Sequence, residues 1–410
     1  MSARPLHLLE VGINWPPETF LCWKLEGLAA KGLRVTVASR AISDPDAGLE
    51  GVELHPLPQG RQRPSRVAVM RQALRLLVTA PRRLLALLRE IRRTDPGFRR
   101  RYRGTFGMLA LYLPLARLRP DVVHFEWNGS AALYLPLFDV WRCPVIASCH
   151  GSEISVDPHV PGEDHVISLL PQIFESASAV HCVSESLRSD LAELGVEAAK
   201  TRLIRQGVDP NRFRPANGAR GPAADRLRLV AIAWPRWVKG LEWALVAVRS
   251  LVDARVPVRL ELIGAELGDQ SERERLRHTV LDLGLGDHVG LLGNLSSDEV
   301  ADRLRASDAL VVPSLDEGLP TVILEAMACG VPVVATDCGG VSEALTDGVE
   351  GFVVPPRDSE ALKRALERLW REPELRTRMG EAGRRTATSR FTLERQLDEF
   401  LAMYREAARS

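Results

Sequence analysis

Short apolar runs alternate along the chain with longer stretches in which apolar and polar positions repeat at helical spacing. In the first half the apolar runs are LHLLEVGI (6–13), RVTVAS (34–39), DVVHFE (121–126), PVIASCH (144–150), AVHCVS (179–184) and TRLIRQGV (201–208). Apolar strands that are separated by helices form a parallel sheet covered on both faces. We therefore expect a doubly wound α/β domain here.

The second half repeats this alternation with LRLVAIAW (227–234), VRLELIG (258–264), HVGLLG (288–293), ALVVPS (309–314), PVVATD (332–337) and EGFVVP (350–355). Ser296 and Glu299 have the spacing of a capping box, which predicts a helix start before ALVVPS. Two Rossmann-like domains are therefore expected.

The domain boundaries follow from composition. Residues 215–226, PANGARGPAADR, are rich in Pro, Gly and Asn and have no apolar periodicity, which is typical of an exposed linker. We expect a first domain over 1–214, a second over 227–389, and a helix in 390–410 that returns to the first domain.

Composition narrows the class of protein. The chain has 410 residues, of which 45% are hydrophobic and 26% charged, which is typical of a globular protein. Its 54 Lys and Arg nearly balance 53 Asp and Glu, which argues against a general nucleic-acid binder. Six scattered cysteines, no CxxC pair and no signal-peptide pattern predict a reducing, cytoplasmic location.

Residues 61–119 differ from the rest, because they hold 16 Arg and only two acidic residues, Glu90 and Asp95. A helical projection places Leu84, Leu87, Leu88 and Ile91 in one stripe, Arg82, Arg89 and Arg93 opposite, and Arg83 and Arg92 at the flanks. Three interpretations stay open for this basic amphipathic helix. It covers the domain core with a solvated outer face, it docks on the anionic inner face of a membrane, or it binds a polyanionic acceptor.

The segment from Ser314 to Gly340, SLDEGLPTVILEAMACGVPVVATDCGG, has the pattern of an anion site. Gly318 permits close backbone approach, and Pro320 lies near a helix start, where amides and the helix dipole favour an anion. Glu317 and Glu325 would add acceptors for hydroxyl groups. This combination suits a nucleotide sugar better than a bare phosphate.

The pattern Glu317, seven residues, Glu325, followed by AMACGVPVV and CGG, resembles the retaining GT-B glycosyltransferases of family 4. VSESLRSDL, RQGVDPNRF and ASDALVVPS extend the resemblance over most of the chain outside the Arg-rich region. The resemblance implies that Glu317 contacts the donor hexose and Glu325 the ribose. It assigns the remaining donor contacts to Gly318, Leu319, Pro320, Thr321, Gly339 and Gly340.

A second group of candidates is WPRWVKGLEWAL, residues 234–245. Lys239 lies near a helix start, where a lysine gains nothing from the helix dipole, so a ligand anion explains it. The family pairs this lysine with an arginine five residues earlier, but this chain has Trp234 there. Arg236 either takes over that role or is a solvated loop residue.

The first half contributes further candidates. His150 follows a strand at the carboxyl edge of the expected sheet, and the resemblance implies a contact with the donor hexose. Glu153 is a candidate for an acceptor hydroxyl. The loop WPPETF resembles a branch of the family associated with exopolysaccharide assembly, so Glu18 and Thr19 either line the cleft or cap a helix.

Several motifs are absent from the sequence. It has no GxxxxGK[ST], no HExxH and no GxGxxG after the first strand, and Asp44-Pro45-Asp46 suits a surface turn rather than a metal site. We expect a metal-independent, cofactor-free enzyme that transfers a hexosyl unit from a UDP- or GDP-sugar to a glycan or lipid-linked acceptor in exopolysaccharide or lipopolysaccharide biosynthesis. Rival interpretations are a hydrolase using Glu317 and Glu325, a nucleotide-sugar epimerase, and a sugar-binding regulator.

Overall fold

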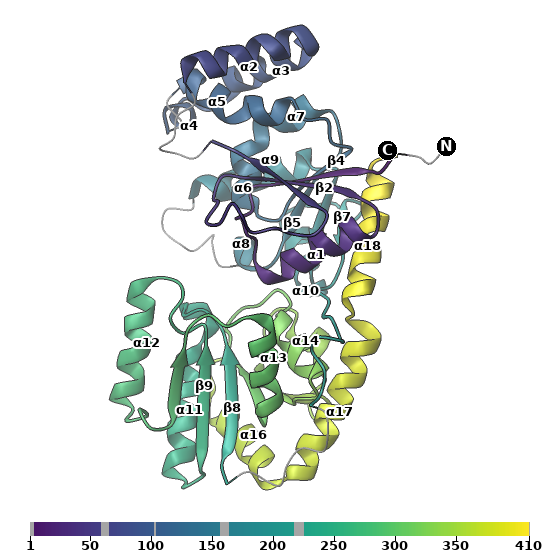
Figure 1. Cartoon of the computed structure of the whole chain (residues 1–410). Coiled ribbons are helices and arrows are strands. Elements are labelled where there is room, and N and C mark those ends of the chain that lie inside the picture. Colours follow the sequence, from purple (N-terminus) through teal and green to yellow (C-terminus); the bar gives the residue numbers. More distant parts are fainter. Residues whose placement is uncertain (1–3, 59–64, 102–103, 156–163, 217–224, 410) are drawn as a thin grey trace.

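The computed structural model describes residues 4–58, 65–101, 104–155, 164–216 and 225–409. They form two domains, each built on one parallel sheet (Figure 1). The first sheet has seven strands in the order β3-β2-β1-β4-β5-β6-β7. Its strands are β1 (His7–Val11), β2 (Arg34–Ser39), β3 (Val52–Pro56), β4 (Val122–Phe125), β5 (Val145–Cys149), β6 (Ala179–Cys182) and β7 (Thr201–Leu203).

The second sheet has six strands in the order β10-β9-β8-β11-β12-β13. They are β8 (Leu227–Ile232), β9 (Val258–Ile263), β10 (Val289–Leu292), β11 (Ala309–Val312), β12 (Val333–Thr336) and β13 (Gly351–Val354). Both sheets are doubly wound, as predicted, and the predicted runs account for every strand except β3.

Helices cover both faces of each sheet. The first domain holds α1 (Thr19–Ala30), α2 (Arg66–Thr79), α3 (Pro81–Arg93), α4 (Pro96–Arg101), α5 (Gly104–Ala116), α6 (Asn128–Tyr134), α7 (Phe138–Trp141), α8 (Ser152–Ser155), α9 (Asp164–Ser176) and α10 (Glu185–Glu193). The second holds α11 (Leu241–Asp253), α12 (Gln270–Asp282), α13 (Ser297–Ala306), α14 (Thr321–Ala328), α15 (Val341–Ala344) and α16 (Ser359–Arg371). The capping box predicted at α13 is present, with Ser296 and Glu299 bonding reciprocally.

The last two helices cross from the second domain to the first (Figure 1). α17 (Pro373–Arg390) packs on α14, and α18 (Leu393–Ala407) packs on α1. Phe400 and Tyr404 of α18 are buried in one apolar cluster with Leu21 and Leu25 of α1. The end of the chain therefore completes the core of the first domain. Most of the predicted linker, residues 217–224, lies outside the described residues.

The Arg-rich region forms the helical layer α2, α3, α4 and α5 at the outer end of the first domain (Figure 1). Leu84, Leu87 and Ile91 of α3 are buried in the main core cluster, so this helix does cover the core. The Arg83 guanidinium donates to the carbonyl oxygen of Leu118 at 2.8 Å. In the described parts of the chain, none of the helices combines the length and apolarity needed to span a bilayer.

Candidate active site

A cavity of about 460 Å³ lies between the carboxyl edges of the two sheets. Both domains contribute side chains, including His150 and Gln206 from the first and Lys239, Glu317 and Thr321 from the second. Ligands of doubly wound sheets bind at this edge, because the loops after the strands converge there. The cavity therefore brings the main sequence candidates of both halves into one site.

Lys239 and Glu317 form an ion pair inside the cavity. The Lys239 Nζ atom lies 2.8 Å from the Glu317 Oε1 atom, which also accepts a hydrogen bond of 2.7 Å from the Ser314 hydroxyl. The Glu317 side chain is only 11% exposed, so the pair is partly desolvated. Lys239 lies in a single 3-10 turn, Trp237–Lys239, and Gly240 follows it with a φ of 56° before α11 begins.

The loop after β11 lines the cavity and carries amides that have no protein partner among the described residues. α14 begins at Thr321 with Pro320 as its N-cap, near the helix start as predicted, and Pro320 makes no side-chain cap bond. Among the described residues, the amides of Gly318, Leu319 and Thr321 donate to no protein acceptor. Unpaired amides at a helix N-terminus form an anion site, since they carry the positive end of the helix dipole.

Gly339 and Gly340, which were predicted to contact the donor, pack against the backbone of Glu317 and Gly318 in the structure. The Gly340 amide donates to the Gly318 carbonyl oxygen at 2.9 Å, so it supports the loop from behind. A Cβ atom on Gly339 would lie 1.6 Å from the Glu317 carbonyl oxygen. Both positions therefore require glycine because the Glu317–Gly318 backbone packs against them. Neither residue lines the cavity.

Glu325 lies one turn into α14, beyond the described lining of the cavity. Burial raises the pKa of its carboxyl to about 7, from an ordinary value of 4.5. A carboxyl of this kind holds its proton well above the usual range, since its charged form is poorly solvated.

His150 projects into the cavity from the end of β5. Its Nε2 atom lies 3.0 Å from the Glu126 Oε2 atom, and Gln206 lies against its Nδ1 atom at 3.4 Å. The Trp127 ring lies 5.0 Å from the imidazole, centroid to centroid. The imidazole is therefore oriented by a carboxylate behind it and an aromatic ring beside it.

A buried charge network stands behind His150. The Lys24 ammonium contacts Glu126 and lies 3.1 Å from Glu10 and 3.2 Å from the Nδ1 atom of His124, and the three charged side chains are at most 3% exposed. Burial alone would raise the pKa of Glu126, but Lys24 and His124 outweigh it and hold that pKa well below its usual value. Burial alone would lower the pKa of Lys24, yet Glu10 and Glu126 raise it. Lys24 and Glu126 are therefore both charged.

Glu10, His124 and Glu126 could also be taken for metal ligands, because they bring three potential ligand atoms close together. The Lys24 Nζ atom contacts all three, so an ammonium already provides the positive charge there. Sequence reasoning missed this network. Its signal was Glu10 and Glu126 in otherwise apolar strands, since a fully buried acid needs a partner.

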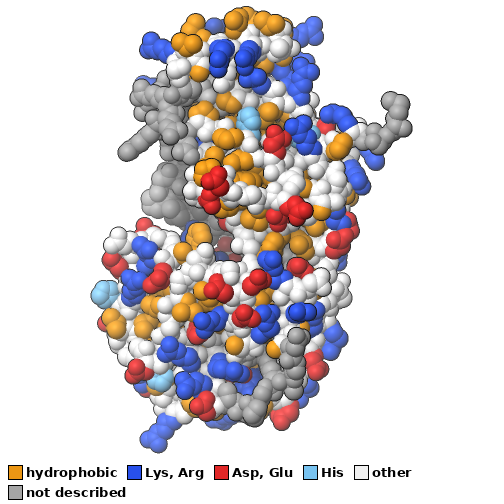
Figure 2. All heavy atoms as spheres, viewed as in Figure 1, with side chains coloured by type: hydrophobic (Ala, Val, Ile, Leu, Met, Phe, Trp, Pro, Cys, Tyr) orange, Lys and Arg blue, Asp and Glu red, His pale blue; other side chains and the backbone are white. Residues whose placement is uncertain are grey.

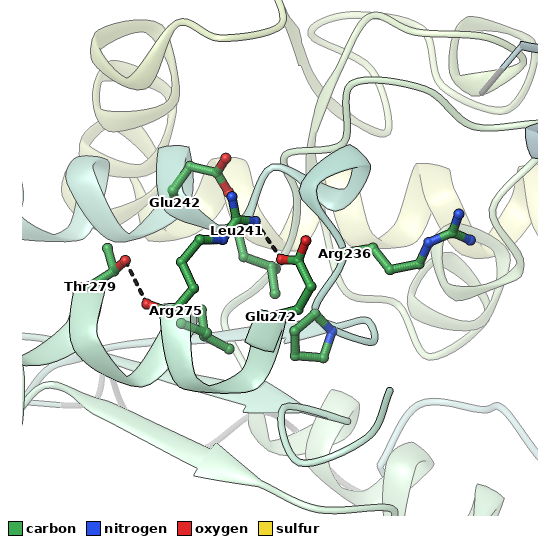
Figure 3. A pocket seen from close by; sticks show the side chains of 8 residues that line it. Arg236, Leu241, Glu242, Glu272, Arg275 and Thr279 are labelled. Carbon is green, nitrogen blue, oxygen red and sulfur yellow. Dashed lines mark hydrogen bonds and ion pairs between the residues drawn. The ribbon is translucent and has the colours of Figure 1, made fainter. Parts of the chain in front are cut away.

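Arg236 and Trp234 lie on the exposed loop after β8 and line the cavity. Figure 3 shows a small neighbouring pocket of about 90 Å³, where Arg275 pairs with Glu272 at 2.6 Å and Arg236 points away from both. Arg236 forms no ion pair among the described residues and can reach a ligand in the cavity. Arg236 therefore places a cation near Trp234, the position at which the family has its arginine.

Glu18 lines the main cavity and also a second, shallower one of about 580 Å³, which contains Arg40 and Trp234. Glu18 is the N-cap residue of α1, but its side chain makes no cap bond. Its Oε2 atom and the Nε atom of Arg40 are buried without a hydrogen-bond partner among the described residues. Thr19 is exposed outside both linings, and the side chain of Glu153 lies outside what the structure describes.

The two domains touch across the site. A Cβ atom on Gly318 would lie 1.9 Å from the His150 carbonyl oxygen, so the loops after β11 and β5 are in direct contact. Beside them, Arg205 of the first domain pairs with Glu343 of α15 at 2.7 Å. The Glu343 carboxylate also accepts hydrogen bonds from the amides of Glu185 and Ser186 at the start of α10. The two domains are therefore in direct contact beside the cavity.

Two facing Rossmann-like domains with a charged cleft define the GT-B class of fold, and solved structures agree. Sucrose-phosphate synthase from Thermosynechococcus elongatus has a TM-score of 0.75 and 22% identity, with 98% of each chain covered. HepE of Anabaena, solved in complex with UDP-glucose, has a TM-score of 0.71 and 18% identity, with 97% of this chain and 100% of that chain covered.

Sequence comparisons give the family. Residues 24–212 match Glycosyltransferase Family 4 and residues 221–386 match Glycosyl transferases group 1. D-inositol 3-phosphate glycosyltransferase of Geodermatophilus obscurus is 30% identical, with 70% of this chain and 67% of the relative covered. A GDP-mannose-dependent alpha-(1-6)-phosphatidylinositol monomannoside mannosyltransferase of Mycobacterium tuberculosis is 32% identical over 67% of this chain and 74% of the relative. The chain therefore belongs to the group 1 glycosyltransferases of family 4, and the protein is a glycosyltransferase.

Proposed function

We propose that the protein transfers a hexosyl unit, with retention at the anomeric carbon, from a UDP- or GDP-sugar to a glycan or lipid-linked acceptor in exopolysaccharide or lipopolysaccharide biosynthesis. The observation that carries this proposal is the set of free amides at Gly318, Leu319 and Thr321 beside Lys239. HepE binds UDP-glucose and the mycobacterial relative uses GDP-mannose, so both bases stay open.

The chemistry follows from where charge develops. Breaking the bond to the sugar leaves a diphosphate with added negative charge and a sugar with positive character. Lys239 and the loop amides stabilise the departing diphosphate, and Arg236 extends toward it. Glu317 and His150, on opposite sides of the cleft, hold the hexose hydroxyls. Glu126 acts as a positioning residue, because its carboxylate fixes the ring of His150.

The acceptor occupies the first-domain side of the cleft. Glu18 joins the two cavities, and its buried, unpaired oxygen is suited to a hydroxyl donor. Arg40 lines the second cavity and has no ion-pair partner among the described residues, which favours an acceptor with an anionic group. Since Lys239 and the amides supply the positive charge at the diphosphate, the reaction as proposed requires no metal, and we place it in the cytoplasm.

A ligand screen tests the donor site. A thermal-shift series with UDP, GDP and their sugars should raise the melting temperature for one base, because a ligand at 100 times its dissociation constant adds about 2.7 kcal/mol to stability. Release of free UDP or GDP only when an acceptor is added separates a transferase from an epimerase and from a sugar-binding regulator. A donor that binds but is never consumed with any acceptor would contradict the proposal.

A further inference from the structure

Helix α2 exposes an apolar stripe on the outer end of the first domain. Leu74 is 61% exposed and Val78 is 76% exposed. The full stripe consists of Val67, Met70, Leu74, Leu77 and Val78. These positions share one face at helical spacing, whereas Val69 and Leu76 on the opposite face are buried. α2 is therefore apolar on two sides, and only one of them is covered.

Arginines border this stripe. Arg66 lies on one side of it and Arg71 and Arg75 on the other, and the neighbouring helix α3 carries Arg82 and Arg92. Among the described residues none of these five arginines has an ion-pair partner. The only acidic residue on α2 and α3 is Glu90, which is already paired with Arg89 and Arg93. Figure 2 shows hydrophobic side chains over this end of the molecule, with Lys and Arg side chains beside them.

The helix that exposes an apolar face in the structure is not the one that the sequence pattern indicated. The sequence placed the basic amphipathic helix at residues 81–93, but its apolar side is buried in the core. The uncovered apolar face belongs to α2, one helix earlier. α3 contributes charge at the border of that face, while α2 contributes the surface that water solvates poorly.

The chemistry of the face selects its partner. A second copy of the chain would bring the same unpaired arginines against each other, with no free acid on α2 or α3 to neutralise them. A nucleic acid would be read by polar and aromatic groups, whereas the centre of this face is aliphatic. Aliphatic side chains bordered by arginines fit the boundary between anionic headgroups and acyl chains.

We infer that α2 docks the protein on an anionic lipid bilayer. The helix lies in the plane of the membrane surface, with Leu74 and Val78 at the acyl boundary and Arg71 and Arg75 at the headgroups. The donor cleft remains in the aqueous phase, because α2 forms the end of the first domain away from the second domain (Figure 1).

Vesicle sedimentation of the full chain tests this inference. The protein should sediment with vesicles of equimolar phosphatidylglycerol and phosphatidylcholine, and more weakly as salt is raised. The double variant Arg71→Gln/Arg75→Gln should lower the partition coefficient about 30-fold. The variant Leu74→Ser/Val78→Ser should lower it at least about 10-fold.

Matched controls keep the test specific. Arg378→Gln/Arg385→Gln on α17 and Leu281→Ser on α12, whose leucine is 68% exposed, should sediment like the unchanged protein. Equal binding to pure phosphatidylcholine, or unchanged binding by either α2 variant, would overturn the inference. So would a dimer in ultracentrifugation that Leu74→Ser/Val78→Ser dissociates, without vesicle binding. Partition needs neither donor nor acceptor, so its failure is separate from any failure of glycosyl transfer.

Discussion

Lys239 is the only cation that the structure pairs with Glu317 among the described residues, and the two lie 2.8 Å apart. If Lys239 stabilises the departing diphosphate, its loss acts mainly on the transition state. We expect Lys239→Ala to lower kcat by a factor of about 100, since one such contact contributes roughly 3 kcal/mol. Steady-state kinetics with the donor identified by the ligand screen measures this.

Lys363→Ala is the matched control, because Lys363 lies on α16 and, among the described residues, forms ion pairs only with acidic residues of its own helix. It should leave kcat unchanged. A Lys239→Ala protein with an unchanged melting temperature and an unchanged kcat would remove Lys239 from the proposed chemistry.

Glu325 gives the protein a specific pH dependence. Its carboxyl has a pKa of about 7 in the folded protein because it is buried, compared with 4.5 for an ordinary carboxyl. Stability from this group is therefore present below pH 4.5 and is lost as pH rises through about 7. We expect the unchanged protein to lose on the order of 3 kcal/mol relative to Glu325→Gln between about pH 4.5 and pH 8.

Melting curves of both proteins across this range measure the difference. Glu374→Gln, an exposed acid at the start of α17, serves as the control and should follow the unchanged protein. Parallel curves for Glu325→Gln and the unchanged protein would show that the carboxyl is solvated.

The site residues fall into two groups by how far the sequence could predict them. Glu317, Lys239 and His150 each stand beside glycines or prolines after a strand, so a local pattern indicates them. Glu126 and Lys24 have no such pattern. Lys24 and Glu126 are 102 residues apart in the sequence, so their contact depends on how α1 packs on β1 and β4. Local spacing does not contain that information.

At the scale of elements, the Lys24 network joins α1 to β1, β4 and α18. The Lys24 ammonium lies 4.3 Å from the Phe400 ring, and the Tyr404 hydroxyl lies 2.7 Å from His124. Replacing Lys24 by Met would leave two buried carboxylates without their cation. We expect Lys24→Met to cost about 4 kcal/mol of stability.

Lys31, the C-cap residue of the same helix, provides the control. It pairs with Asp398 of α18 at 2.7 Å, but Asp398 is 61% exposed. Lys31→Met should cost less than about 1 kcal/mol, because surface ion pairs contribute little. Chemical denaturation that gives equal costs for the two lysine variants would contradict the role of burial.

The same scale shows where sequence patterns fail. The central strands are mostly apolar and buried, and they were predicted. In contrast, β3, with the sequence VELHP, is a partly exposed edge strand that alternates apolar and polar residues. The periodicity of residues 81–93 predicts a helix correctly. It does not indicate which neighbour covers the apolar side, because the partner of α3 is set by tertiary packing.

At the scale of the whole molecule, Glu343 holds the two domains together. Its carboxylate pairs with Arg205 and accepts two amide bonds from the start of α10. Loss of these charge-assisted bonds should weaken the association of the two domains by about 2 kcal/mol, or roughly 30-fold. We expect Glu343→Ala to increase the radius of gyration in small-angle scattering and to raise the KM for the donor severalfold.

Glu381→Ala, an exposed substitution on α17, is the control and should change neither quantity. If Glu343→Ala keeps the compact scattering profile and the KM of the unchanged protein, the domains are held by other contacts.

The position of α18 has a consequence for biosynthesis. The ribosome completes the second sheet before it reaches residues 393–407, yet the first domain buries Phe400 and Tyr404 from that last helix. The domain that is translated first therefore finishes folding last. Until residues 393–407 leave the exit tunnel, α1 and its buried lysine remain uncovered, which gives chaperones an interval to act on the nascent protein.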